Sequence, residues 1–264
     1  MILIWDTCAL NSVCRAIAFH IKRTVAPHVV PTSQGNEFLG TLRDIMTELE
    51  TRCGFFSHTS ESVFALEIDP ELADSKLRNQ DELLDSFCDQ ESFAPAWCVV
   101  LEDRISPVAV AEEEIGDLRP AIQPDPGQQD ISLIVAALRL TTETGQKCIL
   151  VTDDNPLSDR INQLKRDRKQ VFLNGQQHST ALVTAMLSLQ LLRELYVSCG
   201  ADHEFWRSAM FSYCNHYGGD VVPPGQNQLQ SVIQFLKNSF NDRQEKDSRA
   251  AAQEYRSIFG AENG

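Results

Sequence analysis

The fold is decided by residues 130–173, which read DISLIVAALRLTTETGQKCILVTDDNPLSDRINQLKRDRKQVFL. Apolar residues recur at helical spacing from Asp130 to Thr142, and the apolar run from Lys147 to Thr152 predicts a buried strand. An amphipathic stretch from Pro156 to Arg166 predicts a second helix, and Val171 to Leu173 predicts a second strand. Alternation of this kind is typical of an α/β fold with a mainly parallel sheet.

The N-terminal part of the chain continues this pattern. Met1 to Trp5 is continuously apolar and predicts a short buried strand, which a helix over Asn11 to Arg23 follows. A second amphipathic helix is predicted over Asn36 to Thr51. A third helix begins after Thr59 or Ser60, since either hydroxyl side chain is a good N-cap.

Two segments depart from the alternation. The segment from about residue 69 to 126 is acidic and rich in proline, and we expect a helical insertion with irregular links there. After Thr180 the pattern predicts helices only, over roughly residues 181–197, 202–216, 228–240 and 244–259. We therefore expect an α/β core over residues 1–190 and an all-helical extension over residues 191–264.

Composition and hydropathy narrow the class of protein. Hydrophobic residues make up 42% of the chain, which is close to the average for globular proteins and argues against disorder. Met1 to Trp5 is too short for a signal peptide, and the later apolar runs are too short to span a bilayer. We therefore expect a cytoplasmic protein without a membrane partner.

The eight cysteines contain no Cys-x-x-Cys pair and no regular spacing. Zinc sites and disulfide frameworks usually show such patterning, so neither is expected. Cys8, Cys98 and Cys148 lie in apolar runs, which predicts that they are buried as small hydrophobic residues. The metal chemistry of this chain is therefore sought among its carboxylates.

Four acidic residues lie at or near the ends of predicted apolar elements: Asp6, Glu67, Asp130 and Asp154. Asp6 and Asp154 follow apolar strands, and ligands of open parallel sheets collect at the carboxyl ends of the strands. Asp130 opens a helix, where the helix dipole favours an acid, and Glu67 lies within a helix. Converging carboxylates repel one another unless a hard cation such as Mg²⁺ or Mn²⁺ neutralises them. The pattern predicts a metal site that activates water for phosphodiester hydrolysis.

Each candidate also has a purely structural interpretation. Asp6 would then be a turn residue that ends a strand, and Asp130 would be a helix N-cap. Asp153 competes with Asp154 for the position that faces the other acids, and the sequence leaves that choice open. Two threonines are candidates for orienting a metal ligand or a substrate phosphate, although hydroxyl groups often only close local backbone hydrogen bonds: Thr7 and Thr152.

The net charge of −14 argues against generic nucleic-acid binding, which depends on a basic surface. A metal nuclease can still be acidic overall if it carries a local basic rim. One candidate rim is formed by five basic residues: Arg160, Lys165, Arg166, Arg168 and Lys169. The alternative interpretation of this cluster is a solvated helix end.

Four motifs, in order, resemble those of PIN-domain nucleases, a family of metal-dependent ribonucleases with an α/β/α sandwich and an acidic active site. The motifs are Asp6-Thr7-Cys8-Ala9-Leu10, Thr59 to Ile68, Gly127 to Leu138 and Leu150 to Leu157. The resemblance covers about residues 1–190, with the acidic segment as a departure, and it does not extend to the C-terminal helices. It implies a three-layer α/β/α domain whose metal ligands are four acids, with Asp153 assisting: Asp6, Glu67, Asp130 and Asp154.

The resemblance also implies a function. We expect a Mg²⁺- or Mn²⁺-dependent endoribonuclease with RNA as substrate, acting as the toxin of a toxin–antitoxin pair or as a defence effector. An inhibitory or docking protein, or a second copy of the chain, is then the expected partner. Two alternatives stay open: a PIN-like docking module without turnover, and a metal-dependent DNA nuclease or phosphatase that uses the same carboxylates.

Overall fold

The computed structural model describes residues 1–24, 31–68, 93–122, 124, 127–167 and 170–199, together with residues 205, 209 and 212. The predicted helices over 228–240 and 244–259 lie outside these residues, as does nearly all of the predicted helix over 202–216. Residues 69–92 of the predicted insertion also lie outside them. The all-helical C-terminal extension therefore stays a prediction.

Within the described residues, five strands form a parallel sheet in the order β3-β2-β1-β4-β7. The strands are β1 (Ile2–Trp5), β2 (Phe56–Ser60), β3 (Ser106–Val108), β4 (Cys148–Val151) and β7 (Val183–Met186). The central strand β1 pairs with β2 on one side and with β4 on the other, and Trp5 lies opposite Val151. This sheet confirms the predicted α/β fold, and its register makes β1 and β4 end at the same edge.

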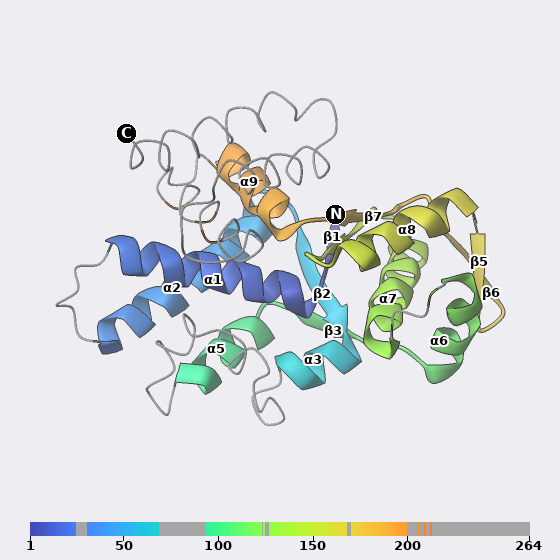
Figure 1. The fold of residues 1–264 in the computed structure, drawn as a ribbon, viewed down its shortest axis with the longest axis horizontal. Helices are drawn as coiled ribbons and strands as arrows, with labels where there is room; N and C mark the ends of the chain where they lie inside the picture. Colours follow the sequence, from blue (N-terminus) through green and yellow to red (C-terminus); the bar gives the residue numbers. More distant parts are fainter. Residues whose placement is uncertain are drawn as a thin grey trace.

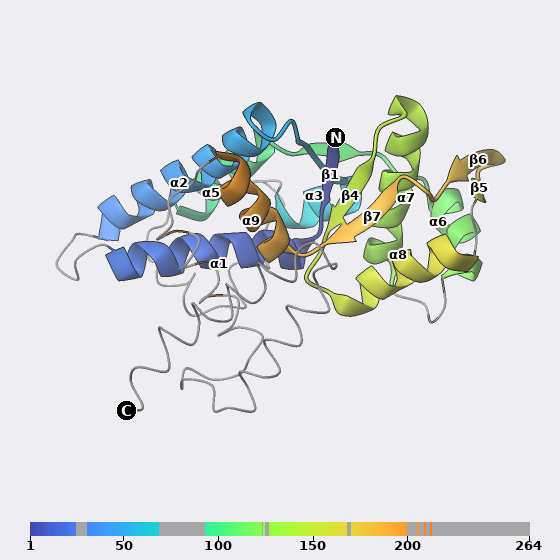
Figure 2. The same ribbon diagram turned by 90° about the horizontal axis from the view of Figure 1, so that it is seen from above.

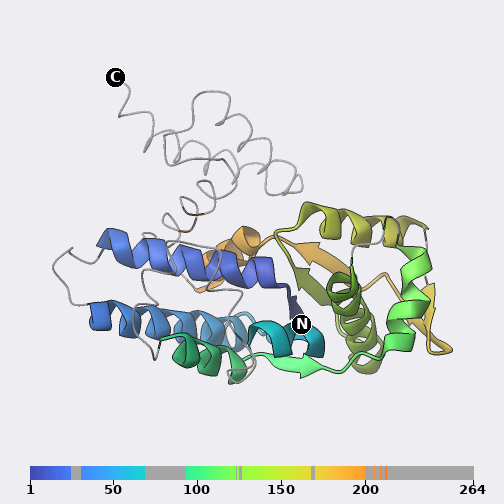
Figure 3. The same ribbon diagram turned by 60° about the horizontal axis from the view of Figure 1, so that its bottom comes forward.

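Helices cover both faces of the sheet, so that the domain has three layers (Figures 1 and 2). One face is covered by α1 (Thr7–Thr24), α2 (Pro31–Thr51), α5 (Phe93–Glu102) and α9 (Ser188–Cys199). The other face is covered by α6 (Glu112–Leu118), α7 (Gln128–Thr144) and α8 (Asn155–Asp167). The short helix α3 (Glu61–Glu67) follows β2, and a 3-10 turn, η1 (Arg119–Ala121), follows α6. Figure 3 shows the strands between the two helical layers.

The alternating side chains of β1 explain why both faces need a cover. Leu3 and Trp5 pack into the apolar cluster under α1, α2, α5 and α9, whereas Ile2 and Ile4 pack into the cluster under α7. A strand buried on both faces reads as a continuous apolar run, as Ile2–Trp5 and Cys148–Val151 do. Helix α7 is buried from Ile131 to Leu138, which fixes its N-terminal turn against the sheet.

A hairpin lies beside the main sheet. Strand β5 (Gln170–Leu173) was predicted, but it pairs antiparallel with β6 (Gln176–Ser179) and forms a separate two-stranded sheet. The connecting residues Asn174 and Gly175 have positive φ angles of 49° and 75°, as the tight turn of a two-residue hairpin requires. The predicted strand is therefore confirmed, but it lies outside the parallel sheet.

Strand β7 replaces the beginning of a predicted helix. The apolar pattern of the sequence predicts a helix from Ala181, whereas Val183–Met186 pairs with β4 and α9 begins only at Ser188. The prediction was wrong here because pairing with a distant strand decides the conformation of a short apolar segment.

Other differences concern the segments that flank the sheet. Strand β2 was not predicted, and β3, within the expected acidic insertion, forms the edge of the sheet by pairing with β2. Helix α1 begins at Thr7 rather than Asn11, and α2 begins at Pro31 rather than Asn36. Proline suits the first turn of a helix, where its missing N–H is no loss. No helix within the described residues is both long and apolar enough to cross a membrane.

Candidate metal centre

Three of the predicted acids meet at the carboxyl edge of the sheet. Asp6 follows β1, Asp154 follows β4 by three residues, and Asp130 lies in the first turn of α7. The Asp6 backbone N–H donates to the Val151 carbonyl at 3.0 Å, which ties the ends of β1 and β4 together. The parallel register therefore brings residues from three distant segments to one place.

Asp6 is buried, with 9% of its surface exposed, and its orientation is fixed by two donors. Thr152 Oγ1 donates to Asp6 Oδ2 at 2.6 Å, and the Cys8 thiol donates to the same oxygen at 2.9 Å. Within the described part of the chain, Asp6 Oδ1 receives no hydrogen bond. Oδ1 is therefore available to a ligand. The contact between Thr152 and a candidate metal ligand is one that the sequence analysis anticipated.

Asp130 and Asp154 carry the electrostatic signature of a crowded acidic site. Burial raises the pKa of Asp130 to about 6, aided by repulsion from Asp6 and Asp154 and opposed by Arg160. Burial also raises the pKa of Asp154, again with repulsion from Asp6, while a hydrogen bond from the Leu157 backbone N–H and the Arg160 charge oppose the rise. Arg160 Nη1 lies 4.0 Å from Asp130 Oδ2. One guanidinium thus only partly offsets the repulsion among these three carboxylates.

Asp153 and Asp154 face different surroundings, which answers the question that the sequence left open. Asp153 Oδ1 accepts the backbone N–H of Ser188 at 2.8 Å, and Oδ2 accepts the Ser188 hydroxyl at 2.5 Å. Ser12 also hydrogen-bonds the Asp153 carboxylate. Asp153 is 5% exposed and ties the end of β4 to the start of α9. The geometry therefore favours Asp154 as the ligand and gives Asp153 a structural role.

The fourth predicted acid, Glu67, is the last residue of α3, and its side chain lies outside what the structure describes. Helix α3 begins after Ser60, which caps it by accepting the Val63 N–H at 3.4 Å. Ser132 Oγ, two residues beyond Asp130 in α7, lies 2.8 Å from Ser60 Oγ. The two helix starts are thus joined beside the acids. A metal-binding role for Glu67 stays a prediction.

Thr7 and Cys8 both lie in the first turn of α1, directly after Asp6. Thr7 is half-buried, and its proposed orienting role stays a prediction. Cys8 was expected to be a small hydrophobic residue, but it is a polar link. Besides donating to Asp6, its sulfur accepts the Asp153 N–H at 3.2 Å and lies 3.4 Å from Thr152 Oγ1.

Burial and the nearby Asp6 charge raise the pKa of the Cys8 thiol well above its usual range. The thiol therefore stays protonated and acts as a donor to Asp6 rather than as a nucleophile. The spacing of Cys8 two residues after Asp6, at a helix start, is the signal that the sequence offered for this role.

The donor set fits Mg²⁺ or Mn²⁺ in its chemistry. These cations prefer carboxylate and water oxygens, and a cation would relieve the repulsion that raises the pKa of Asp130 and Asp154. Among the side chains that the structure describes, however, no group of three or more His, Cys, Asp or Glu residues could hold a metal ion as it stands. Binding by Asp6, Asp130 and Asp154 would therefore require their side chains to draw together.

Comparison with known proteins does not identify a family. No protein-family model, curated protein or solved structure matches the chain. The resemblance to PIN-domain nucleases therefore rests on the four motifs in the sequence. Any function must be argued from the carboxylate edge itself.

Proposed function

We propose that this protein is a Mg²⁺- or Mn²⁺-dependent endoribonuclease of the PIN-domain type. One observation carries the proposal: Asp6, Asp130 and Asp154 come from three separate segments and crowd together at the carboxyl edge of a parallel sheet. Such crowding costs free energy unless a ligand relieves it. The four motifs in order, and the three-layer architecture that the resemblance implies, support the same assignment.

The residues at this edge have separate roles in the proposed hydrolysis, since the carboxylates would bind the metal and the guanidinium would attract the phosphate. A bound Mg²⁺ or Mn²⁺ would lower the pKa of a bound water and stabilise the charge that develops on the phosphodiester. Asp6 offers Oδ1, since Thr152 and Cys8 hold Oδ2. Asp130 and Asp154 supply further carboxylate oxygens, and Glu67 is the proposed fourth ligand. The Arg160 guanidinium is positioned beside Asp130, where it would attract a substrate phosphate.

A second candidate is a docking module without turnover. It is favoured by the absence, among the described side chains, of a group that could hold a metal ion as it stands. The net charge of −14 would then suit a basic segment of a partner protein. Roles as a toxin or defence effector, an inhibitory protein partner and self-association rest on the resemblance alone.

The decisive assay compares substrates and metals. The full chain is incubated with RNA, single-stranded DNA and a phosphomonoester, each with Mn²⁺, with Mg²⁺ and with a chelator. Asp6→Asn and Asp130→Asn are tested beside Asp44→Asn, an exposed acid on α2 that serves as the control. Metal-dependent cleavage of RNA that is lost in the first two variants and kept in the control supports the proposal.

Other results of this assay would change or overturn the proposed function. Cleavage of DNA or of the phosphomonoester in preference to RNA would assign the same carboxylates to a DNA nuclease or a phosphatase. No cleavage by the wild-type chain with either metal would overturn the enzyme in favour of the docking module. A circular RNA adds one distinction, because only an endonuclease opens it.

A further inference from the structure

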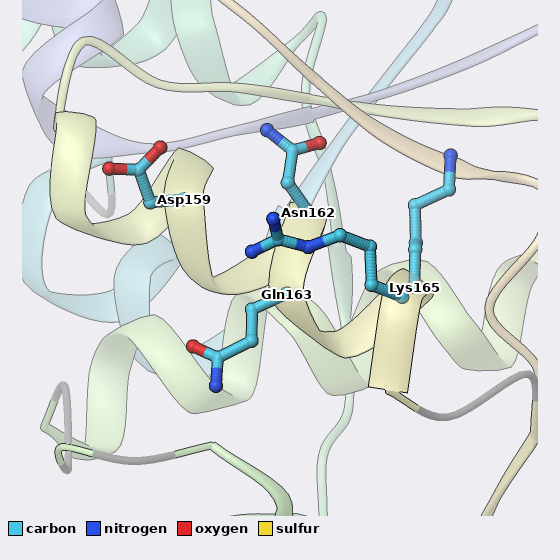
Figure 4. A pocket seen from close by; sticks show the side chains of 5 residues that line it. Asp159, Asn162, Gln163 and Lys165 are labelled. Carbon is cyan, nitrogen blue, oxygen red and sulfur yellow. The ribbon is translucent and has the colours of Figure 1, made fainter.

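A polar hollow lies on the solvent side of α8, beyond the carboxylate edge. It has a volume of about 660 Å³, within the range of roughly 300–1,000 Å³ that ligand sites span. Five side chains of α8 line it: Asp159, Asn162, Gln163, Lys165 and Arg166. Figure 4 shows Asn162 and Lys165 projecting to the same side of the helix, with Gln163 on the opposite side.

The hollow and the carboxylate edge share one helix. Helix α8 begins directly after Asp154, and its residue Arg160 approaches Asp130. Its apolar side chains Leu157, Ile161 and Leu164 are at most 3% exposed and attach the helix to the sheet. The polar face is therefore turned to solvent, and it leads from the acids to the basic last turn.

The last turn of α8 carries two basic residues, Lys165 and Arg166, beside one acid, Asp167. Neither Lys165 nor Arg166 forms an ion pair within the described part of the chain. Burial lowers the pKa of Lys165, and the charge of Lys147, which directly precedes β4, lowers it further. Lys165 and Lys147 repel each other, and an anion bound beside them would relieve that repulsion. Asp159 is the acid among the lining residues, and it opposes such binding.

We propose that α8 binds the sugar-phosphate backbone of single-stranded RNA, with Lys165 and Arg166 each holding a phosphate, several nucleotides from the one that is cleaved. This inference rests on the proposed ribonuclease function. The eleven residues of α8 from Asn155 to Lys165 span about 16 Å of helix, which is the rise of up to about five stacked nucleotides. The amide of Asn162, which projects to the same side of the helix as Lys165, adds a donor for phosphate or ribose oxygens along this path (Figure 4).

Binding and cleavage are separated in the test. Fluorescence anisotropy measures the affinity of the full chain for a labelled twelve-nucleotide single-stranded RNA, in chelator and over a salt series. The variants are the double substitution Lys165→Gln with Arg166→Gln, the single substitution Asp159→Asn, and Arg43→Gln as the control. Arg43 is exposed on α2, the helix layer on the other face of the sheet.

The double variant is expected to bind RNA about ten-fold more weakly, and the slope of log affinity against log salt should fall by about 1.4 for two lost phosphate contacts. Asp159→Asn should bind more tightly, because it removes the opposing charge. Arg43→Gln should match the wild type. In cleavage assays the double variant should raise KM for the long RNA with kcat kept, and should leave a dinucleotide substrate unaffected because it is too short to reach Lys165.

Two outcomes distinguish a failure of the α8 binding surface from a failure of the ribonuclease assignment. A wild type that cleaves RNA, together with a double variant that binds and cleaves long RNA as well as the wild type does, overturns the α8 surface and leaves the ribonuclease assignment intact. A wild type that binds RNA with the expected dependence on Lys165 and Arg166 but cleaves nothing supports the surface and overturns the ribonuclease. Equal weakening in Arg43→Gln would also overturn the surface, since the effect would then reflect net charge alone.

Discussion

Asp153 and Asp154 are neighbours in the chain, but they belong to two different regions of the edge of the sheet. Asp153 points to the start of α9, where the Ser188 N–H and hydroxyl both donate to it. Asp154 lies toward Asp6, whose charge raises the pKa of the Asp154 carboxyl beyond the effect of burial. The Asp153 carboxylate is thus held by donors from Ser12 and Ser188, whereas the Asp154 carboxylate has one backbone donor, the Leu157 N–H, and is repelled by Asp6.

The difference teaches how to separate structural acids from functional ones. A buried carboxylate with matched donors stabilises the fold, and its removal leaves those donors unsatisfied. A carboxylate held among other carboxylates destabilises the empty protein and gains its favourable energy only from a ligand. Substitution of the structural acid should therefore mainly lower stability, and substitution of the functional acids should mainly lower activity.

The largest expected effect is on catalysis. Asp154→Asn should lower kcat/KM for RNA with Mn²⁺ by about a thousand-fold, or about 4 kcal/mol, because a metal ligand is lost. Its urea midpoint should change little, since Asp154 is only half-buried. Steady-state kinetics and urea denaturation check both halves. Cleavage by Asp154→Asn at more than a tenth of the wild-type rate would remove Asp154 from the site.

The next effect is on stability. Asp153→Ala should lower the free energy of unfolding by about 2–4 kcal/mol, because the buried N–H and hydroxyl of Ser188 lose their acceptor. Urea denaturation at pH 7 measures this loss. Ser188→Ala should share part of it, and the double variant should lose less than the sum of the two. If the losses of the two single variants add fully in the double variant, Asp153 and Ser188 do not stabilise the protein through their contact.

For Asp130 the predicted change in stability has the opposite sign, because its substitution should stabilise the metal-free protein. Its folded-state pKa of about 6 lies above the ordinary value of 3.8, so the folded protein binds the proton more tightly than the unfolded chain. The acid therefore favours folding at low pH, and that contribution is lost as the pH rises from about 4 through about 6. Without metal, Asp130→Asn should be more stable than wild type by about 1–2 kcal/mol at pH 7.5, allowing for solvent screening.

The stability difference between Asp130→Asn and wild type should shrink as the pH falls toward 4, because the carboxyl is then protonated in the folded protein and, with an ordinary pKa of 3.8, starts to be protonated in the unfolded chain as well. Thermal unfolding in chelator at pH 7.5, 6 and 4.5 measures this trend. Asp44→Asn is the control and should show no such trend. A destabilised Asp130→Asn at pH 7.5 would mean that Asp130 is a structural N-cap rather than a strained acid.

The smallest effect concerns the orientation of Asp6. Cys8→Ala removes a donor to Asp6 Oδ2 and should reduce kcat/KM by about five- to ten-fold, in line with about 1 kcal/mol for one hydrogen bond. Cys8→Ser keeps a donor and should restore most of the activity. The loss should appear in the concentration of Mn²⁺ needed for half-maximal activity. Equal losses of activity in Cys8→Ala and Cys8→Ser would indicate that Cys8 supports activity through its packing rather than by orienting Asp6.

The parts of the fold that were predictable depend on local pattern. The continuous apolar runs of β1 and β4 and the periodic α7 identified the centre of the sheet, and alternation indicated parallel strands. Strand β7 was missed because it becomes a strand only by pairing with β4. Strand β3 was missed because it is short and lies at the edge, within an acidic segment.

The candidate site divides in the same way. The meeting of Asp6 and Asp154 followed from the rule that parallel strands end at one edge, whereas Asp130 reaches them from the first turn of α7. The choice between Asp153 and Asp154 depended on Ser188, which lies 35 residues away in the chain. The role of Cys8 depended on Thr152, which lies 144 residues away. Contacts between distant residues are set by packing, and no local pattern reports them.

The central claim is that the edge formed by Asp6, Asp130 and Asp154 binds a divalent cation. Isothermal titration of the metal-free full chain with Mn²⁺ at pH 7.5 tests it most directly, without any assumption about substrate. The account predicts saturable binding by the wild type and by Asp44→Asn, and loss of that binding in Asp6→Asn and Asp154→Asn. Absence of saturable binding by the wild type, or unchanged affinity in Asp6→Asn and Asp154→Asn, would contradict it.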